Sequence, residues 1–207
     1  TASVAPYGGT AAVFTPNPIA IGIPTEGDPI LIDISASITT NGMTGRLHGE
    51  GKPLPHAWVQ DAAGTASTDP GVLFTDPPGT ILPIGGQDHG HKGYGLALMI
   101  EAMTQALSGF GRADTPTGWG ASVFVQVIDP AAFAGREAFI RQTAWLAAAC
   151  RENPPAHGDA PVRLPGERAL ARRRAALSDG LALYPGIMEG LAPLAATAGL
   201  SPPAPLT

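Results

Sequence analysis

A glycine-rich run that passes directly into an apolar, helix-like segment constrains this chain more than any other feature of its sequence. The run extends from Gly85 to Glu101 and holds five glycines, two histidines and one lysine. Glycine lets a backbone approach a ligand closely and adopt positive φ. The start of the following helix presents unpaired N–H groups and a positive dipole end, and Lys92 adds a positive charge there. The pattern predicts a site for a phosphate or carboxylate, and it suits a nucleotide cofactor.

Two simpler interpretations of the same run stay open: it is only a turn before a helix, and Lys92 is a solvated surface charge. The run also lacks the Gly-x-Gly-x-x-Gly pattern of βαβ dinucleotide-binding units, because Gly93-Tyr94-Gly95 is followed by Leu96-Ala97-Leu98. A nucleotide bound here is therefore not expected to lie on a βαβ unit.

The composition restricts the class of protein. A chain of 207 residues suits one domain or slightly more and can bury a good core. Charged residues are scarce at 14%, and 27 glycines with 22 prolines indicate a loop-rich protein. The net charge of −5 argues against a nucleic-acid partner. The tightest basic cluster, Arg172–Arg174 with Arg163 and Arg168 nearby, is interpreted as the solvated face of an amphipathic helix.

The single cysteine and the apolar segments indicate a cytoplasmic protein. Cys150 cannot form an intrachain disulfide, and its alanine-rich helical surroundings favour a buried structural thiol over a nucleophile. No apolar stretch is long enough for a membrane span, and no signal pattern opens the chain. Because the chain starts at Thr1 close to a strand-like segment, we expect a truncated chain, a processed product or a gene fragment.

Residue periodicity predicts strands and helices without strict alternation. The predicted strands are 19–24 and 29–34, joined by a turn at 25–28, then the short 58–61, 121–128 and the brief 162–164. The predicted helices are 92–108, 131–151, one that begins near Pro165-Gly166-Glu167, and 186–199. Residues 41–80 are otherwise rich in turns, and 80–84 is a short apolar piece.

The order of these elements favours an α/β fold with a mixed, largely antiparallel sheet and covering helices. Pro154-Pro155 is the clearest boundary and divides the chain into residues 1–153 and a helical segment, 154–207. Residues 35–40, small and hydroxyl-bearing, follow the second strand, where α/β sheets usually hold ligands.

Part of the same run also offers candidate metal ligands. Asp88, His89 and His91 stand close together, but no distant glutamate or His-x-x-x-His pair completes a ligand set. We therefore expect no metal and do not favour metal-dependent hydrolysis.

Several motifs in a fixed order resemble the malate/L-lactate dehydrogenase family of NAD(P)-dependent oxidoreductases, whose fold differs from the Rossmann lactate and malate dehydrogenases. Relatives in that family include ureidoglycolate dehydrogenase, 2,3-diketogulonate reductase and Δ1-piperideine-2-carboxylate reductase. The resemblance spans nearly the whole chain, and its most specific match is the segment 90–98. The other matching motifs are Pro6-Tyr7-Gly8-Gly9, residues 17–24, residues 32–37, residues 58–64, Thr68-Asp69-Pro70 and residues 164–167.

The resemblance implies a cofactor, NAD or NADP, and a set of residues that bind it. The dinucleotide sites of the family fall here on three groups: Asp33, Ile34, Ser35, Ala36, Ser37, Ile38 and Thr39; His91 and Lys92; and Pro165, Gly166 and Glu167. Small side chains at 35–37 suit close approach of a cofactor, Lys92 suits a phosphate, and Glu167 suits a ribose hydroxyl. Simpler roles stay open for two of them: a helix N-terminal charge for Glu167 and turn stabilisation for Asp33. No acidic or arginine residue stands at a spacing that indicates contact with the ribose 2′ position, so the choice between NAD and NADP stays open.

The resemblance also implies hydride transfer between the nicotinamide and a 2-hydroxy or 2-oxo acid, in a homodimer. Residues 1–153 are then the NAD(P)-binding domain, and 154–207 pack with the N-terminal domain in full-length relatives. The catalytic histidine and arginine of the family fall upstream of Thr1, and none of the five histidines matches that motif, so the catalytic residues stay unassigned. Thr15-Pro16 replaces the usual Gly-Thr. The alternative is a non-catalytic nucleotide-binding or assembly remnant.

Overall fold

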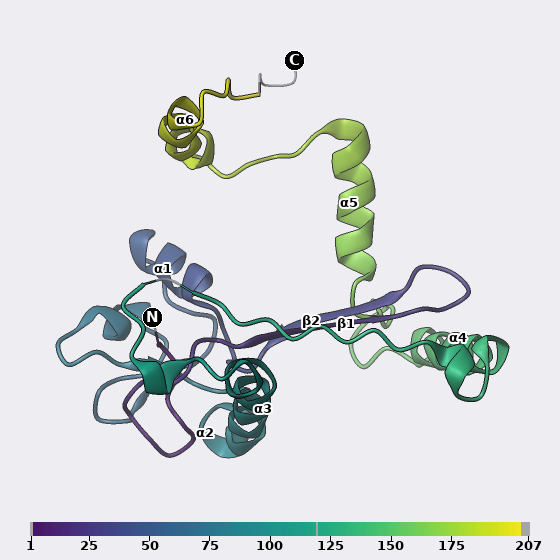
Figure 1. The fold of residues 1–207 in the computed structure, drawn as a ribbon, viewed down its shortest axis with the longest axis horizontal. Helices are drawn as coiled ribbons and strands as arrows, with labels where there is room; N and C mark the ends of the chain where they lie inside the picture. Colours follow the sequence, from purple (N-terminus) through teal and green to yellow (C-terminus); the bar gives the residue numbers. More distant parts are fainter. Residues whose placement is uncertain (1, 119, 204–207) are drawn as a thin grey trace.

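An antiparallel hairpin forms the long axis of the protein. The computed structural model describes residues 2–118 and 120–203. Strands β1 (Pro18–Ile23) and β2 (Ile30–Ser35) pair along their whole lengths, from Pro18 opposite Ser35 to Ile23 opposite Ile30. In Figure 1 this hairpin runs from the body that holds the N-terminus and α3 toward α4 and α5. Both strands and the turn between them confirm the sequence prediction.

A second, smaller sheet lies in the body. Strands β3 (Val59–Gln60), β4 (Ala66–Ser67) and β5 (Thr80–Ile81) pair antiparallel in the order β4-β3-β5. Val4 forms isolated bridges to Phe14 and to Ile81, and these bridges join the N-terminal segment to this sheet. The architecture is therefore a set of small antiparallel sheets with helices around them, as predicted.

The described residues form six α-helices, and two of them lie within the glycine-rich run. Thr40 caps the first helix, since its side chain accepts a hydrogen bond from the Met43 N–H at 3.2 Å. The helices are α1 (Asn41–Gly49), α2 (Gly86–His89), α3 (His91–Glu101), α4 (Arg136–Arg151), α5 (Glu167–Asp179) and α6 (Ile187–Thr197). Single 3₁₀ turns lie at Pro70–Phe74, Arg112–Asp114 and Pro130–Ala132, and a π-helical turn at Ala102–Ala106 extends α3.

The apolar core is divided into two clusters. The larger lies in the body and contains Val4, Phe14, Ala36, Leu54, Val59, Ile81 and Ala97. The smaller joins Ile30 of β2 to Ala147 of α4 and Leu164, with the half-buried Cys150 packed against it. Cys150 was expected to be buried but is half-buried in the structure, and its structural role stays a prediction. Each end of the hairpin therefore has its own core.

The predicted strand at residues 121–128 is wrong. In the structure this segment forms no β-ladder with any described residue. Its apolar side chains are extensively exposed: Val125 is 78% and Val127 is 91% accessible. β-Branched residues favour an extended backbone, but a strand needs a partner to satisfy its N–H and C=O groups. No described segment supplies that partner.

Other boundaries also differ from the sequence predictions. Residues 162–164 are irregular rather than a strand, and the predicted helix 131–151 begins only at Arg136 because a 3₁₀ turn and Gly135 precede it. The first part of the glycine-rich run is a helical turn, α2, rather than a loop. Within residues 41–80 the structure confirms the short predicted strand 58–61, which is β3, and adds α1 and β4 where the pattern indicated only turns.

Candidate cofactor site

The end of β2 and the start of α3 meet at Gly93. The Gly93 N–H donates to the Ile84 carbonyl at 3.1 Å, and the Ile84 N–H donates to the Ala36 carbonyl at 2.9 Å. A Cβ atom at Gly93 would lie 2.2 Å from the Ile84 nitrogen and 2.6 Å from the Ala36 oxygen. Only glycine allows this approach. The structure therefore brings together the first two predicted groups, residues 33–39 and His91-Lys92.

Hydroxyl side chains follow β2 in a chain of hydrogen bonds. Ser35 Oγ donates to the Ser37 carbonyl at 2.9 Å, and Ser37 Oγ donates to the Thr39 carbonyl at 2.5 Å. Thr39 Oγ1 is buried and has no hydrogen-bond partner among the described residues. A buried hydroxyl without a partner is costly. Because Thr39 Oγ1 has almost no accessible surface, a cofactor group reaches it only after this segment moves.

The remaining residues of this segment have different exposures. Asp33 and Ile34 are exposed residues of β2, Ala36 is buried in the larger core cluster, and Ile38 is half-buried. Asp33 stands opposite Ala20 within the hairpin and not in a turn. The geometry therefore does not place Asp33 in the turn-stabilising role that the sequence left open.

His91 and Lys92 are exposed at the first turn of α3. The His91 ring meets the Tyr7 ring edge to face, with 5.8 Å between centroids. The helical path already starts at Gly86, and the N–H groups of Gly93 and Tyr94 donate to the carbonyls of Ile84 and Gly90. Two of the N–H groups expected to bind an anion therefore already donate to protein carbonyls. The Lys92 ammonium is then the main group at this position that can attract an anion.

The third predicted group contacts the other end of β2. The Leu31 N–H donates to the Pro165 carbonyl at 3.0 Å, and a Cβ atom on Gly166, whose φ is +93°, would lie 2.7 Å from Leu31 Cβ. Leu31 precedes Ala36 by five residues, which is about 16 Å along an extended strand. The three predicted groups therefore lie along one strand, two at one end and Pro165–Glu167 toward the other.

The Glu167 carboxylate already has two partners. Its Oε1 accepts from Arg151 Nε at 2.6 Å, and its Oε2 accepts from the Leu164 N–H at 3.1 Å. The hydrogen bond from Arg151 holds the pKa of Glu167 below its ordinary value, against an opposing effect of burial. This geometry favours the helix N-terminal charge over the ribose contact, which stays a prediction.

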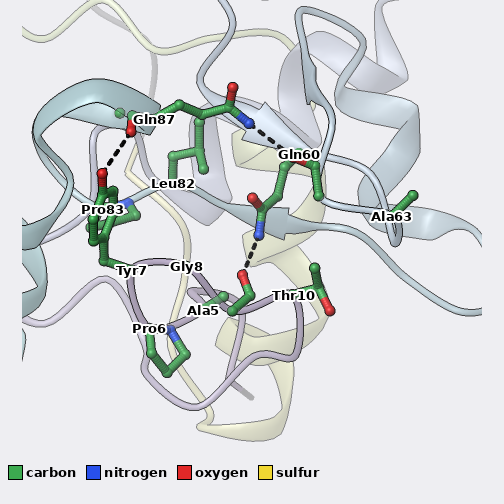
Figure 2. Close-up of a pocket in the computed structure, with 13 residues that line it drawn as sticks. Ala5, Pro6, Tyr7, Gly8, Thr10, Gln60, Ala63, Leu82, Pro83 and Gln87 are labelled. Atoms are coloured by element: carbon green, nitrogen blue, oxygen red, sulfur yellow. Dashed lines mark hydrogen bonds between the residues drawn. The ribbon is translucent and has the colours of Figure 1, made fainter.

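A pocket beside α2 involves residues that the sequence did not single out as site residues. Its volume is about 440 Å³, and it lies between the segment 5–10 and the segment 82–87 (Figure 2). Three hydrogen bonds hold its wall: Tyr7 Oη to the Gln87 carbonyl at 3.0 Å, Gln60 Nε2 to the Gly9 carbonyl at 2.7 Å, and Gln87 Nε2 to the Gly64 carbonyl at 2.9 Å. The motif Pro6-Tyr7-Gly8-Gly9 is the feature of the sequence that marks this pocket. The spacing of its residues alone does not indicate a function for it.

Two further observations concern metal ligands and membrane spans. Among residues 2–118 and 120–203, no three His, Cys, Asp or Glu side chains are grouped so as to hold a metal ion. None of the described helices combines the length and apolar character required to cross a bilayer.

Comparison with known proteins identifies the family of this chain. The profile described as malate/L-lactate dehydrogenase matches residues 1–192. The chain belongs to this family. It is 33% identical to the L-lactate dehydrogenase of Cupriavidus necator, over 97% of this chain and 58% of that protein. It is 34% identical to the (2R)-3-sulfolactate dehydrogenase (NADP(+)) of Chromohalobacter salexigens, over 83% of this chain and 50% of that protein.

Solved structures of the family share the fold. The malate dehydrogenase of Pyrococcus horikoshii superposes with a TM-score of 0.79 at 26% identity, over 96% of this chain and 56% of that one. The Δ1-piperideine-2-carboxylate reductase of Pseudomonas syringae superposes with a TM-score of 0.72, also at 26% identity, over 94% and 57% of the two chains. The chain therefore spans a little over half the length of these relatives.

Proposed function

We propose that this chain is the NAD(P)-binding portion of an oxidoreductase that transfers a hydride between the nicotinamide and a 2-hydroxy or 2-oxo acid. The observation that carries the proposal is the close approach at Gly93, which joins the hydroxyl-rich end of β2 to His91 and Lys92. Relatives of the chain are named as lactate, malate and sulfolactate dehydrogenases, whose substrates share the 2-hydroxy acid group. The cytoplasm is the compartment that we expect for this activity.

The residues of the chain have separate roles in this proposal. The bound cofactor supplies the hydride chemistry. Ser35–Ser37 present backbone and hydroxyl groups to it, Lys92 meets a phosphate, and the contact at Gly93 fixes the distance between these two parts. None of the five histidines is assigned as the proton donor, so residues 1–207 alone are expected to bind the dinucleotide with little or no turnover.

Fluorescence titration tests the proposal. NADH and NADPH are each added to the folded chain, and the emission of the reduced nicotinamide is followed. A saturable change in intensity is expected for at least one of them. A flat response with both, from a sample whose circular dichroism shows the folded state, would contradict the proposal.

We also propose that the chain assembles as a homodimer, and the segment 121–128 supports this. Unpaired N–H and C=O groups on an extended apolar segment form a template for pairing with another chain, and a lysine on such an edge blocks pairing. Val125→Lys is expected to convert a dimer to a monomer in size-exclusion chromatography with light scattering. Leu177→Lys on α5, where the side chain is 72% exposed, is the matched control and should leave the mass unchanged. A monomeric wild-type chain would overturn the dimer.

A further inference from the structure

Three arginines surround an open hollow at the start of α5. Arg163, Arg168 and Arg172 line a cavity of about 500 Å³ whose floor includes Pro165 and Gly166. Arg168 and Arg172 are four residues apart on α5 and therefore lie on one face of that helix, while Arg163 approaches from the segment before it. The sequence had suggested only a solvated helix face at this position.

No acidic side chain in the described part of the chain forms an ion pair with these three arginines, although Arg163 is close enough to Glu167 to help Arg151 lower the pKa of that carboxyl. The neighbouring arginines are paired, Arg151 with Glu167 at 2.6 Å and Arg174 with Asp28 at 3.0 Å. Arg163, Arg168 and Arg172 form no ion pair with any described residue, and both oxygens of the nearby Glu167 are already engaged. Like charges one helical turn apart destabilise a helix. A bound anion would remove that repulsion.

Guanidinium groups suit one kind of anion in particular. Their planar donors form paired hydrogen bonds with the oxygens of a phosphate, and a phosphate monoester carries close to two negative charges at neutral pH. The hollow is open to solvent and wide enough to admit such a group on a nucleotide. Its chemistry therefore fits a terminal phosphate better than a neutral sugar.

We propose that this three-arginine hollow binds the 2′-phosphate of the adenosine ribose, so that the chain prefers NADP to NAD. This inference rests on the proposed function, because Pro165 and Gly166 belong both to the hollow and to the third predicted cofactor group. The hollow adjoins Leu31 through Pro165 and Gly166. Its free positive charge next to the third predicted cofactor group is the observation that assigns it the 2′-phosphate.

The expected preference follows from the strength of charge-assisted hydrogen bonds. Two or three such bonds that NADH cannot form correspond to an affinity difference of about 10- to 100-fold in favour of NADPH. Screening by solvent at this exposed site favours the lower part of that range.

Fluorescence titration of the full chain with NADPH and NADH, in the wild type and in single variants, tests the inference. Arg172→Gln is expected to weaken NADPH binding about tenfold and to leave NADH binding unchanged. Arg168→Gln is expected to act in the same direction and serves as the second variant if Arg172→Gln does not fold. Arg173→Gln removes the same charge from the adjacent position, which does not line the hollow, and should change neither affinity.

A competition arm separates the nucleotide phosphate from a general anion. Adenosine 2′,5′-bisphosphate should displace NADPH at a much lower concentration than 5′-AMP or inorganic phosphate. Equal wild-type affinities for NADPH and NADH would overturn the inference while the proposed function stands. An equal loss of affinity for NADPH and NADH in Arg172→Gln would also overturn it, because it would place the arginines at the pyrophosphate that both cofactors share. Competition by inorganic phosphate as strong as competition by the bisphosphate would overturn it as well. Absence of binding by both cofactors would instead remove the proposed function itself.

Discussion

The N–H of Gly93 in α3 donates a hydrogen bond to the carbonyl of Ile84, and no side chain fits between the two residues. A Cβ atom on Gly93 would lie 2.2 Å from the Ile84 nitrogen. Since Ile84 in turn bonds to Ala36, this single contact sets the distance between the α3 helix and the segment that follows β2. The candidate site depends on that distance.

Gly93→Ala is therefore expected to destabilise the chain. Backbone atoms on both sides must move to admit the methyl group, which costs about 1–3 kcal/mol of unfolding free energy. Urea denaturation measures the loss, and the same variant should bind NADPH more weakly. Gly95→Ala is the matched control on the same helix, because a Cβ atom there has no neighbour within 4 Å. The control should stabilise the chain by up to about 1 kcal/mol through helix propensity. Similar stabilities for the two variants would mean that the close approach is absent.

Lys92→Met tests the phosphate contact. Loss of the ammonium is expected to weaken binding of both NADH and NADPH by about tenfold, because both cofactors carry the pyrophosphate. Lys52→Met removes the only other lysine, which pairs with Glu50 at 2.8 Å away from the site, and should leave both affinities unchanged. An unchanged affinity in Lys92→Met would assign Lys92 to the solvated surface.

Thr39→Val tests the unpartnered hydroxyl of the segment after β2. In the free chain this change removes a buried polar atom that has no hydrogen bond, so the unfolding free energy should stay the same or rise by about 1 kcal/mol. The same variant should bind NADPH more weakly if the cofactor supplies the missing partner.

Thr44→Val provides the comparison for that measurement. Thr44 is equally buried, but its hydroxyl donates to the carbonyls of Thr40 and Asn41 at 3.1 and 3.0 Å. Its loss should lower the unfolding free energy by about 0.5–1.5 kcal/mol without an effect on cofactor affinity. Equal destabilisation by the two substitutions would show that Thr39 has a protein partner.

The Arg151–Glu167 pair predicts a dependence of stability on pH. The pKa of Glu167 is lowered in the folded chain, so the unfolded chain binds the proton more readily as pH falls. The stabilisation is complete well above the ordinary pKa of 4.5 and is lost as pH falls through and below that value. Wild type should therefore exceed Glu167→Gln in Tm at pH 7, and the difference should shrink toward pH 3.

Glu137→Gln is the matched control for that pH series. Glu137 also lies in the first turn of its helix, α4, and it forms no ion pair with any described residue. Both variants lose a favourable charge at a helix N-terminus, but only Glu167→Gln also loses a partner arginine. Identical pH profiles for the two variants would contradict the role of Arg151.

The hairpin was predictable from local pattern, whereas parts of the site were not. Residues 19–24 and 29–34 carry β-branched side chains between turn formers, and their pairing needs only the short turn between them. The pattern also predicted a short strand at 58–61, where β3 lies, but it gave no sign that Val59 pairs with Ile81 of β5, which is distant in sequence. Residues 121–128 show the opposite case, a strong strand pattern without a partner in the described chain.

The spacing of apolar residues predicted the α3 helix, but it identified only some of the residues that the helix buries. Leu96 and Ile100 pack against the larger core as expected, while Met99, Met103 and Leu107 are exposed. The most buried positions are Gly93 and Ala97, since small residues let the helix lie close to Ile84 and Ala36. A pattern of large side chains cannot reveal such an approach. The arginine hollow was hidden in the same way, because Arg163 and Arg172 line one cavity only once α5 has formed.

Amide chemical-shift mapping is the most direct test of the central claim that the dinucleotide lies along β2. NADPH is titrated into the ¹⁵N-labelled chain, and the amide signals are followed. We expect large shifts at Ser35–Thr39 and at His91 and Lys92, with further shifts near Gly166, and none in α6. Shifts confined to the Tyr7–Gln87 pocket, or spread over residues that do not include the segment 35–39, would contradict this claim.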